Sequence, residues 1–542
     1  MRRRDFLKLA GGIVIGATAV GACSETTTAS HPQASTSTLE TSTTSTTEPS
    51  PTSVSSTTVP SPATSDDWRG FGSSLQGRLV LPTSPEYPVD AQSYNPVFDG
   101  AHPEGIAYCA SAGDVALAVD FAEQHAIELS LRSGGHCYGG WSTGPGLVVD
   151  VSPMNEVVFD PVTGLVSVGS GTRLIDLYAA LAPYGVAVPG GSCPGVGIAG
   201  LALGGGFGVL GRKYGLTCDN LQSADVVLAS GEMVTCDAVQ APDLFWALRG
   251  GGGGSFGAVT RFSFLTHPIG TLALFTLVWP WSSAAAVVSA WQNWAPAAPD
   301  ELWSNCLLVA SQTTPAGEAP AARVTGVYVG SEAVLQELVD SFVTEVGTSP
   351  FTSFVGSAGY LDAMLIEAGC DNYSVAECHL PSQNPAGLLA RAPFAAKSDI
   401  VESKLSAVAI STLLEAVEQR QASPLLAGGG FVLDASGGAI NRVSPEATAY
   451  VHRTALATMQ YSAGWAVSSP PSVVAANRQW IESAWQSMRP FVSSGAYVNY
   501  ADPELPDWQQ AYWGSNFERL KEVKRLYDPG DVFHFPQSIP PE

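Results

Sequence analysis

The chain has 542 residues and a formal net charge of −24 at pH 7. This length exceeds what one compact core supports, so we expect two substructures together with non-globular ends. The acidic balance excludes a nucleic-acid groove, which needs a positive stripe to replace counterions. Nine cysteines without a C-x-x-C pair argue against a zinc module and against a dense disulfide scaffold, so we expect no metal site.

The N-terminal residues have the pattern of an export signal. Arg3 and Arg4 precede an apolar run that ends at Cys23, and this run is shorter than the roughly 20 residues that a bilayer requires. The pattern predicts a twin-arginine signal over residues 1–23, with an uncleaved anchor helix as the alternative. The letters VGAC that end at Cys23 resemble a lipobox, in which the cysteine becomes the lipidated first residue.

A linker is predicted after this signal. Residues 24–66 are dominated by Ser, Thr and Pro, and such a segment cannot bury enough apolar surface to offset its chain entropy. The twin-arginine route carries folded proteins, so we expect a cofactor to be inserted before export. The protein would then lie outside the cell or on its surface and contact a membrane only through its signal or a lipid anchor at Cys23.

Residues 67–269 have a mixed α/β pattern with many glycines. Ser111 and Asp114 predict a capping box ahead of an amphipathic helix that ends at His125, and Glu128–Arg132 follows as a strand. The other expected strands are short and bounded by turn residues. They are Leu147–Val151, Val157–Asp160, Leu165–Val168, and a hairpin of Ala224–Ala229 and Met233–Asp237.

The pattern changes in residues 270–488, where strand-like runs alternate with helix-like runs. We expect an antiparallel sheet with helices on one face, and a final segment, residues 489–542, that folds back onto the first substructure. Cys370 and Cys378 could close a short disulfide, although the sequence alone does not establish this pairing. The clearest runs are the strands Leu272–Trp279, Asn305–Ser311 and Ala322–Val329 and the helices Ala284–Trp294 and Glu332–Val346.

Two glycine-rich motifs carry the chemistry. In RSGGH at residues 132–136, consecutive glycines let the backbone turn its N–H groups toward one anion, as a pyrophosphate requires. Taken alone, such a short motif is more often a glycine turn beside an ordinary buried histidine. The second motif, GGSCPGVG at residues 190–197, precedes further glycines that include Gly200. Few side chains cover the backbone of this segment, so a large flat ligand can lie against it.

The order of several separated motifs resembles the berberine bridge enzyme and glucooligosaccharide oxidase family. These motifs are RSGGH, GGSCPGVGIAGLALGGGFG, RKYGLTCDNL, DLFWALRGGGGGSFGAVT, YVNY and YDPGDVFHFPQSI, and they span residues 68–540. The resemblance implies an α+β flavoprotein of the vanillyl-alcohol-oxidase fold. A PCMH-type FAD-binding domain of two α/β subdomains would come from residues 67–269 and 489–542, and residues 270–488 would form the substrate domain.

The resemblance also implies how the cofactor is held. His136 would bind the 8α-methyl carbon of FAD covalently, and Cys193 would bind ring carbon C6. Val196 matches a position where a small residue is associated with oxygen access to the flavin, which favours an oxidase over a dehydrogenase. The other cofactor-binding residues implied are Arg132, Ser133, Gly134, Gly135, Gly197, Gly200 and Asn499.

Three further residues are implied for the reaction. The motif Tyr497–Tyr500 is predicted as a strand with Tyr497 and Asn499 on one face, and Tyr500 would face the flavin and take the substrate hydroxyl proton. Asp434 would accept that proton in turn, although on turn chemistry alone it is equally a turn residue ahead of two glycines. Gln460 would bind substrate by hydrogen bonds.

The expected function is that of an exported oxidase. It would transfer a hydride from an alcohol carbon of a sugar, an oligosaccharide or a glycoside to FAD, and O2 would be reduced to H2O2. An oxidase of a secondary metabolite or an amine is the alternative enzyme, and a flavin-retaining binding or redox protein is the alternative from another class. Cys137 stands where the family commonly has Ser, and Gly430 stands where sugar oxidases can carry an aromatic residue above the substrate.

Overall fold

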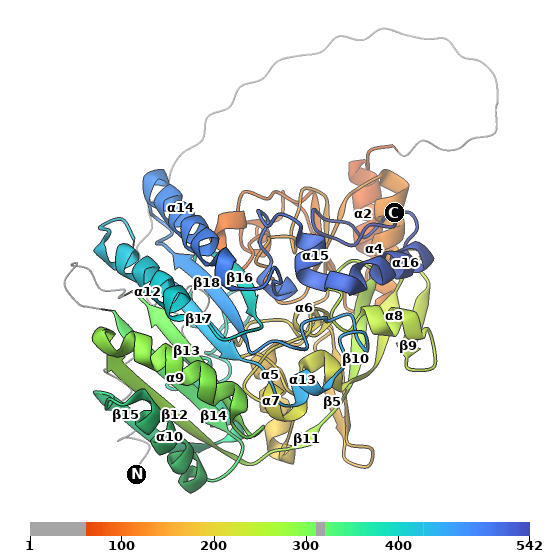
Figure 1. Cartoon of the computed structure of the whole chain (residues 1–542). Coiled ribbons are helices and arrows are strands. Elements are labelled where there is room, and N and C mark those ends of the chain that lie inside the picture. The colour runs from red at the N-terminus through yellow and green to blue at the C-terminus, as the bar shows by residue number, and fades with distance from the viewer. Residues whose placement is uncertain (1–60, 311–319, 427) are drawn as a thin grey trace, which may run out of the picture.

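The computed structural model describes residues 61–310, 320–426 and 428–542. The predicted signal, Cys23 and most of the predicted linker lie outside these residues. The described chain forms two parts. One is a glycine-rich part with two main sheets and a two-stranded ribbon, and the other has one large sheet under parallel helices (Figure 1). In the described ranges we find no helix with the length and apolar character to span a membrane.

The first sheet has the strand order β1-β2-β4-β3, in which β2, β4 and β3 run parallel. Ser111 caps α4 by accepting a hydrogen bond from the Asp114 backbone. The Asp114 carboxylate accepts instead from the backbone of Gln76, Gly77 and Ala110, so the predicted capping box is only half formed. The elements here are α2 (Ser65–Ser74), β1 (Arg78–Val80), α3 (Tyr87–Asp90), η1 (Pro96–Phe98), β2 (Gly105–Tyr108), α4 (Ala112–His125), β3 (Leu129–Arg132) and β4 (Leu147–Asp150).

The second sheet is antiparallel, with the order β5-β6-β10-β8-β9. The predicted hairpin is confirmed as β8 and β9, in which Val227 pairs with Met233. The elements are β5 (Val157–Asp160), β6 (Leu165–Gly169), α5 (Leu174–Leu181), η2 (Ala182–Tyr184), β7 (Val186–Ala187), α6 (Ile198–Leu203), α7 (Gly211–Tyr214), η3 (Thr217–Asn220), β8 (Leu221–Val227), β9 (Met233–Asp237), α8 (Pro242–Ala247), β10 (Ala258–Leu265) and β11 (His267–Pro268).

The third sheet is antiparallel throughout, with the order β15-β12-β14-β13-β17-β18-β16. Its outer face is buried under α9, α10, α12 and α14 (Figure 1), which confirms the predicted sheet with helices on one face. The elements are β12 (Thr271–Pro280), η4 (Trp281–Ser283), α9 (Ala284–Ala297), β13 (Leu302–Val309), β14 (Ala321–Tyr328), α10 (Glu332–Val346), β15 (Thr352–Gly359), α11 (Tyr360–Glu367), β16 (Phe394–Val401), α12 (Ala407–Ala422), β17 (Gly430–Ala435), α13 (Ala439–Arg442), β18 (Ala457–Gly464) and α14 (Pro471–Met488).

The C-terminal residues return to the glycine-rich part, where α16 packs on α8. The side chain of Lys524 is fully buried there and donates hydrogen bonds to Asp528 and to the carbonyl oxygens of Ser255 and Phe533. The last elements are η5 (Arg489–Phe491), η6 (Val498–Tyr500), α15 (Trp508–Trp513), η7 (Gly514–Asn516) and α16 (Phe517–Tyr527). The inner face of the third sheet is thereby set opposite the glycine-rich loops.

Candidate active site

A cavity of about 330 Å³ lies between the two parts. Its floor consists of the two glycine-rich loops, its roof is the inner face of the third sheet, and the turn at η6 closes one side. The cavity brings together all the residues that the sequence predicted for the site. Those that line it are Arg132, Ser133, Gly134, Gly135, His136, Cys193, Val196, Gly197, Gly200, Asp434, Gln460, Asn499 and Tyr500.

The two loops touch at glycines. A Cβ atom on Gly134 would stand 2.2 Å from the backbone nitrogen of Gly197, and one on Gly197 would stand 2.1 Å from Oγ of Ser133. Only glycine permits this approach. The Ser133 hydroxyl donates to the carbonyl oxygen of Ser170 at 2.7 Å, which fixes the first loop against the end of β6.

His136 lies at the meeting point of these loops. Its ring stacks on Tyr94, with 4.0 Å between the ring centroids, and an added Cβ on Gly195 would stand 3.0 Å from its Nε2. Burial, with a smaller contribution from the positive charge of Arg173, lowers the pKa of His136 to about 3. The imidazole is therefore neutral at physiological pH and keeps a nitrogen lone pair for bonding.

Several buried polar atoms of the cavity lack a hydrogen-bond partner, as expected for the binding site of a large, flat, polar cofactor. Within the described chain, buried Nε2 of His136, Nη1 of Arg132 and Oγ of Ser142 have no hydrogen-bond partner, and buried polar atoms normally have one. Gly200 lines the cavity, and a Cβ there would meet nothing within 4 Å. Bare backbone and unsatisfied polar atoms along one cavity fit FAD, which carries both a flat ring system and a pyrophosphate.

The roof residues share one face of the sheet. Directly paired residues of antiparallel strands lie on the same face, and Asp434 pairs with Asn305 on one side and with Thr458 on the other. Gln460 pairs with Val432 and therefore lies on this face too. Its amide nitrogen donates to the Tyr138 hydroxyl at 3.2 Å, so it crosses from the roof to the floor.

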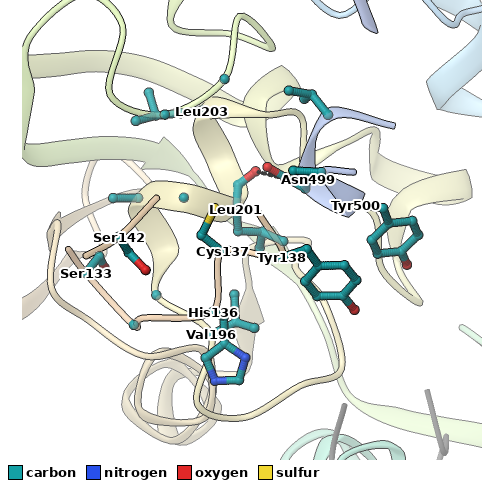
Figure 2. A pocket seen from close by; sticks show the side chains of 18 of the residues that line it. Ser133, His136, Cys137, Tyr138, Ser142, Val196, Leu201, Leu203, Asn499 and Tyr500 are labelled. Atoms are coloured by element: carbon teal, nitrogen blue, oxygen red, sulfur yellow. Dashed lines mark hydrogen bonds between the residues drawn. The ribbon is translucent and has the colours of Figure 1, made fainter. Parts of the chain in front are cut away.

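The prediction of a strand at Tyr497–Tyr500 is wrong. Residues Val498–Tyr500 form the 3-10 turn η6, closed by a hydrogen bond from the backbone of Tyr500 to the carbonyl oxygen of Tyr497. The turn places Tyr500 beside Tyr138 (Figure 2), with stacked rings whose centroids are 5.4 Å apart. Tyr500 also lies edge-on to Tyr497, with 5.0 Å between the ring centroids. Tyr500 and Asn499 both line the cavity even though they do not alternate as on a strand.

Asn499 is held by the glycine-rich part. Its amide nitrogen donates to the carbonyl oxygen of Leu201 at 3.0 Å (Figure 2) and to the Tyr497 hydroxyl at 2.9 Å. A Cβ on Gly204 would stand 2.1 Å from Oδ1 of Asn499. The C-terminal turn is therefore locked onto α6.

Burial raises the pKa values of the two proposed catalytic groups. The pKa of Tyr500 lies well above its ordinary value because the ring is buried and the charge of Asp434 is near. The pKa of Asp434 rises to about 7 because of burial, partly offset by a hydrogen bond from the Asn305 side chain. Tyr500 is thus a neutral phenol at pH 7, and Asp434 can exchange a proton near neutral pH.

The structure adds residues that the sequence did not single out. Tyr138 stacks on Tyr500 and binds Gln460, and its place two residues after His136 was a signal that could have identified it. Glu367 at the end of α11 is buried, and its pKa is raised partly by the charge of Asp434. Gly430 cannot carry a side chain, since a Cβ would stand 2.1 Å from the carbonyl oxygen of Leu308, and Trp303 lines the cavity instead.

The chain is similar to known families and to known proteins. Residues 103–237 match the family described as "FAD binding domain", and residues 496–540 match the family "Berberine and berberine like". An uncharacterized FAD-linked oxidoreductase from Bacillus subtilis, YgaK, is 32% identical over 86% of this chain and 98% of its own length. Xylooligosaccharide oxidase from Thermothelomyces thermophilus is 29% identical over 84% of this chain and 91% of its own length.

Solved structures show the same similarity. Physcomitrella patens BBE-like 1 superposes with a TM-score of 0.79 at 30% identity and covers 88% of this chain and 99% of its own. A chitooligosaccharide oxidase superposes with a TM-score of 0.76 at 26% identity, with 88% of this chain and 100% of its own covered. The similarity therefore includes both parts of the fold.

Proposed function

The chain belongs to the berberine bridge enzyme-like family of FAD-linked oxidoreductases, and we propose that it is an oxidase of an alcohol carbon in a sugar, an oligosaccharide or a glycoside. The observation that carries this proposal is that Tyr500, Asp434, His136 and Cys193 line one cavity, in which the charge of Asp434 acts on Tyr500. Two similar proteins named as oligosaccharide oxidases support a carbohydrate.

Residues of the third sheet and of the C-terminal turn η6 remove the proton from the substrate. Tyr500 binds the reacting hydroxyl and passes its proton to Asp434, because the buried phenol does not ionise by itself at neutral pH. Gln460 and Tyr138 orient the neighbouring hydroxyl groups of the substrate. When bound, FAD supplies the acceptor for the hydride that leaves the same carbon.

The cofactor is proposed to be attached through two side chains. The neutral, unsatisfied imidazole of His136 would bind the 8α-methyl carbon, and the Cys193 thiol would bind ring carbon C6. Cys193 lines the same cavity as His136. Arg132, Ser133, Gly134 and Gly135 would hold the pyrophosphate, and Val196 would leave room for O2, whose reduction yields H2O2.

We further propose that the chain is exported through the twin-arginine route and that Cys23 carries a lipid. This proposal rests on the sequence of residues 1–23. Replacing both Arg3 and Arg4 by Lys should leave the FAD-loaded protein inside the cell. Fractionation of cells with an antibody against the folded part measures the outcome, and secretion of the variant at the wild-type level would contradict it.

Peroxide release tests the proposed reaction. The purified flavoprotein is screened against monosaccharides, oligosaccharides, glycosides, aromatic alcohols and secondary amines. Peroxide production should depend on a carbohydrate. A response confined to aromatic alcohols or amines would replace the proposed substrate class with the alternative one.

The role of Tyr500 is tested by Tyr500→Phe. Anaerobic reduction of the flavin by substrate should slow about 10²–10⁴-fold, the usual contribution of a positioned acid or base. The control is Tyr184→Phe, because Tyr184 is 60% exposed. Stopped-flow absorbance measures the rate, and a loss of only a few-fold for Tyr500→Phe would rule out this tyrosine as the proton acceptor.

A further inference from the structure

A row of three polar residues crosses the inner face of the third sheet and ends in the active-site cavity. Thr325 on β14 pairs directly with Asn305 on β13, and Asn305 pairs directly with Asp434 on β17. Directly paired residues lie on the same face of a sheet, with their Cβ atoms about 4.5–5.5 Å apart. The register of three neighbouring strands therefore brings Thr325, Asn305 and Asp434, which we call the polar row, into side-chain contact distance.

Hydrogen bonds along the polar row orient the amide group of Asn305. The Thr325 hydroxyl donates to Oδ1 of Asn305 at 2.6 Å. The Asn305 side chain also forms a hydrogen bond with the Asp434 carboxyl group. Since a carboxylate can only accept, the group of Asn305 that binds it is the amide nitrogen. Thr325 thus occupies the acceptor of the amide, and its two donor hydrogens are left to face Asp434.

The position of Thr325 is fixed by the fold rather than by the cavity. Asn305 and Asp434 line the cavity, whereas Thr325 does not. The backbone carbonyl oxygen of Thr325 accepts a hydrogen bond from the Ser304 hydroxyl at 2.8 Å, and Oγ of Ser304 accepts one from the indole nitrogen of Trp291 on α9 at 3.0 Å. A helix on the outer face therefore holds the strand segment that carries Thr325, and a substrate in the cavity reaches only the other end of the polar row.

The ionisable groups on the inner side that sense the charge of Asp434 are Tyr500 and Glu367. The guanidinium of Arg212, near the end of β17, donates to backbone carbonyl oxygens, including that of Ser436. β17 packs against β13, β18 and α12, and their ionisable residues lie on the outer face or on the helix that covers it. These residues are Cys306, Tyr461, Glu415, Glu418 and Arg420.

Asn305 therefore supplies the direct polar contact of Asp434 within its own sheet. Burial raises the pKa of Asp434 to about 7, and the hydrogen bond from Asn305 opposes this rise. A hydrogen bond to the charged form of a group favours that form, and hydrogen bonds in a chain polarise and strengthen one another. The bond from Thr325 to Asn305 should accordingly strengthen the bond from Asn305 to Asp434.

We propose that Thr325 is a positioning residue, whose hydroxyl fixes Asn305 so that the Asn305 amide nitrogen donates to Asp434 and stabilises it as the carboxylate that accepts a proton. The catalytic consequence rests on the proposed function, in which Tyr500 passes the substrate proton to Asp434. Thr325 reaches neither substrate nor cofactor from its place outside the cavity. Its effect on the reaction must therefore pass through Asn305.

The polar row is tested first without substrate. Difference infrared spectra of the FAD-loaded protein follow the carbonyl band of protonated carboxyl groups as a function of pH, and the band of Asp434 is identified by its loss in Asp434→Asn. Thr325→Val should move the midpoint of this band upward by about half to one pH unit, the size of one lost hydrogen bond. Thr325→Ser keeps the hydroxyl and should keep the wild-type midpoint.

The matched control is Thr276→Val. Thr276 on β12 pairs directly with Thr325 and is 4% exposed, but it lies one strand further from Asp434. The same substitution there should leave the midpoint unchanged. A wild-type midpoint in Thr325→Val, or an equal shift in Thr276→Val, would overturn the proposal.

A double-variant cycle shows whether Thr325 acts through Asn305. Asn305→Leu removes the donor itself and should raise the Asp434 midpoint by at least as much as Thr325→Val. Adding Thr325→Val to Asn305→Leu should then cause no further shift, because coupled residues do not contribute additively. Additive shifts would show that Thr325 does not act through Asn305 and would overturn the proposed role.

A kinetic readout separates positioning from folding. The rise of kcat/KM with pH should move to higher pH in Thr325→Val and stay in place in Thr325→Ser, with KM close to that of the wild type in both. A purely structural role would lower the melting temperature and leave the midpoint of the rise unchanged. Because the infrared titration needs no substrate, an absence of carbohydrate oxidation would refute the proposed function without affecting the result for the polar row.

Discussion

The proposed roles of Tyr500 and Asp434 are linked, because both residues line one cavity and burial there raises the pKa of each. Burial keeps the Tyr500 phenol neutral, and it brings the pKa of Asp434 to about 7. A phenolate formed before substrate binding is therefore not available at neutral pH. In the proposed reaction the proton moves through Tyr500 to Asp434 while the substrate is oxidised, so the pH dependence of the reaction should report the carboxyl group.

The first prediction concerns Asp434→Asn. The carboxylate is the form that accepts a proton, so kcat/KM of the wild type should rise as pH increases through the region near 7. Asparagine cannot accept the proton, so kcat/KM should fall about 10²–10⁴-fold. In this variant kcat/KM should also no longer rise with pH in this region. Steady-state pH profiles measure both effects. Gln460→Ala is the control, because the loss of a substrate hydrogen bond should raise KM without moving the midpoint.

The second prediction concerns the attachment of the flavin. His136→Ala and Cys193→Ala should each keep the pigment on the denatured chain through the remaining bond, and the double variant should release it. The mass of the denatured protein, with its visible spectrum, measures attachment. Cys137→Ser is the control, because Cys137 is the thiol adjacent to His136 in the chain and should carry no bond. Release of FAD from wild-type protein in acid would show that neither bond exists.

At the scale of elements, the sequence predicted the helices and strands that have a clear apolar pattern. It did not predict turns that depend on contacts with distant residues. The hairpin of β8 and β9 and the helices α9 and α10 were predicted because their apolar periodicity is long enough to decide their type. The segment Tyr497–Tyr500 alternates like a strand, yet contacts of Tyr500 with Tyr138 and of Tyr497 with Gly206 hold it in a turn. Asp434 lies at the end of β17 rather than in the turn that its glycine neighbours allowed.

Glu367 shows why part of the site could not be predicted. In the sequence it ends a short apolar run, and nothing there indicates which distant residue it meets. Asp434, whose charge contributes to the raised pKa of Glu367, is 67 positions further along the chain, and α11 packs against β12, β15 and α5. Long-range pairs between segments without a shared motif are visible only once the layers are assembled.

The third prediction concerns how α16 holds the C-terminal segment. Lys524 and Asp528 are both fully buried, so Lys524→Met should leave an unpaired buried carboxylate and lower the free energy of unfolding by about 3–5 kcal/mol. Lys521→Met removes a pair whose glutamate, Glu518, is 78% exposed, and it should cost about 0–1 kcal/mol. Chemical denaturation measures both. Equal losses for the two variants would refute the anchoring role of Lys524.

At the scale of the whole molecule, the family, the α+β class and the PCMH-type FAD-binding fold predicted from the ordered motifs are confirmed. The overall fold does not identify the substrate. Gly430 and Trp303 show the reason, because the position where sugar oxidases can carry an aromatic residue is closed to any side chain and a tryptophan from another strand lines the cavity. The shape of the roof therefore depends on residues that no shared motif contains.

The two parts of the fold should unfold together, because buried ion pairs and one continuous apolar core join them. Arg453 donates to both carboxylate oxygens of Asp219, at 2.8 and 2.7 Å, and the two side chains are 1% and 9% exposed. Arg453→Met should leave the Asp219 charge buried and lower stability by about 3–5 kcal/mol. The exposed pair of Arg442 and Asp300 provides the control, since Arg442→Met should cost about 0–1 kcal/mol.

The measurement compares a probe of the glycine-rich part with a probe of the whole chain. Flavin circular dichroism reports the glycine-rich part, and far-ultraviolet circular dichroism reports the whole chain, including the large sheet and its helices. If the parts form one cooperative unit, both signals should share one midpoint in the wild type and should shift together in Arg453→Met. A variant in which the flavin signal survives while the sheet and helices melt would show that the roof is an independent domain and that the Asp219 contact is only local.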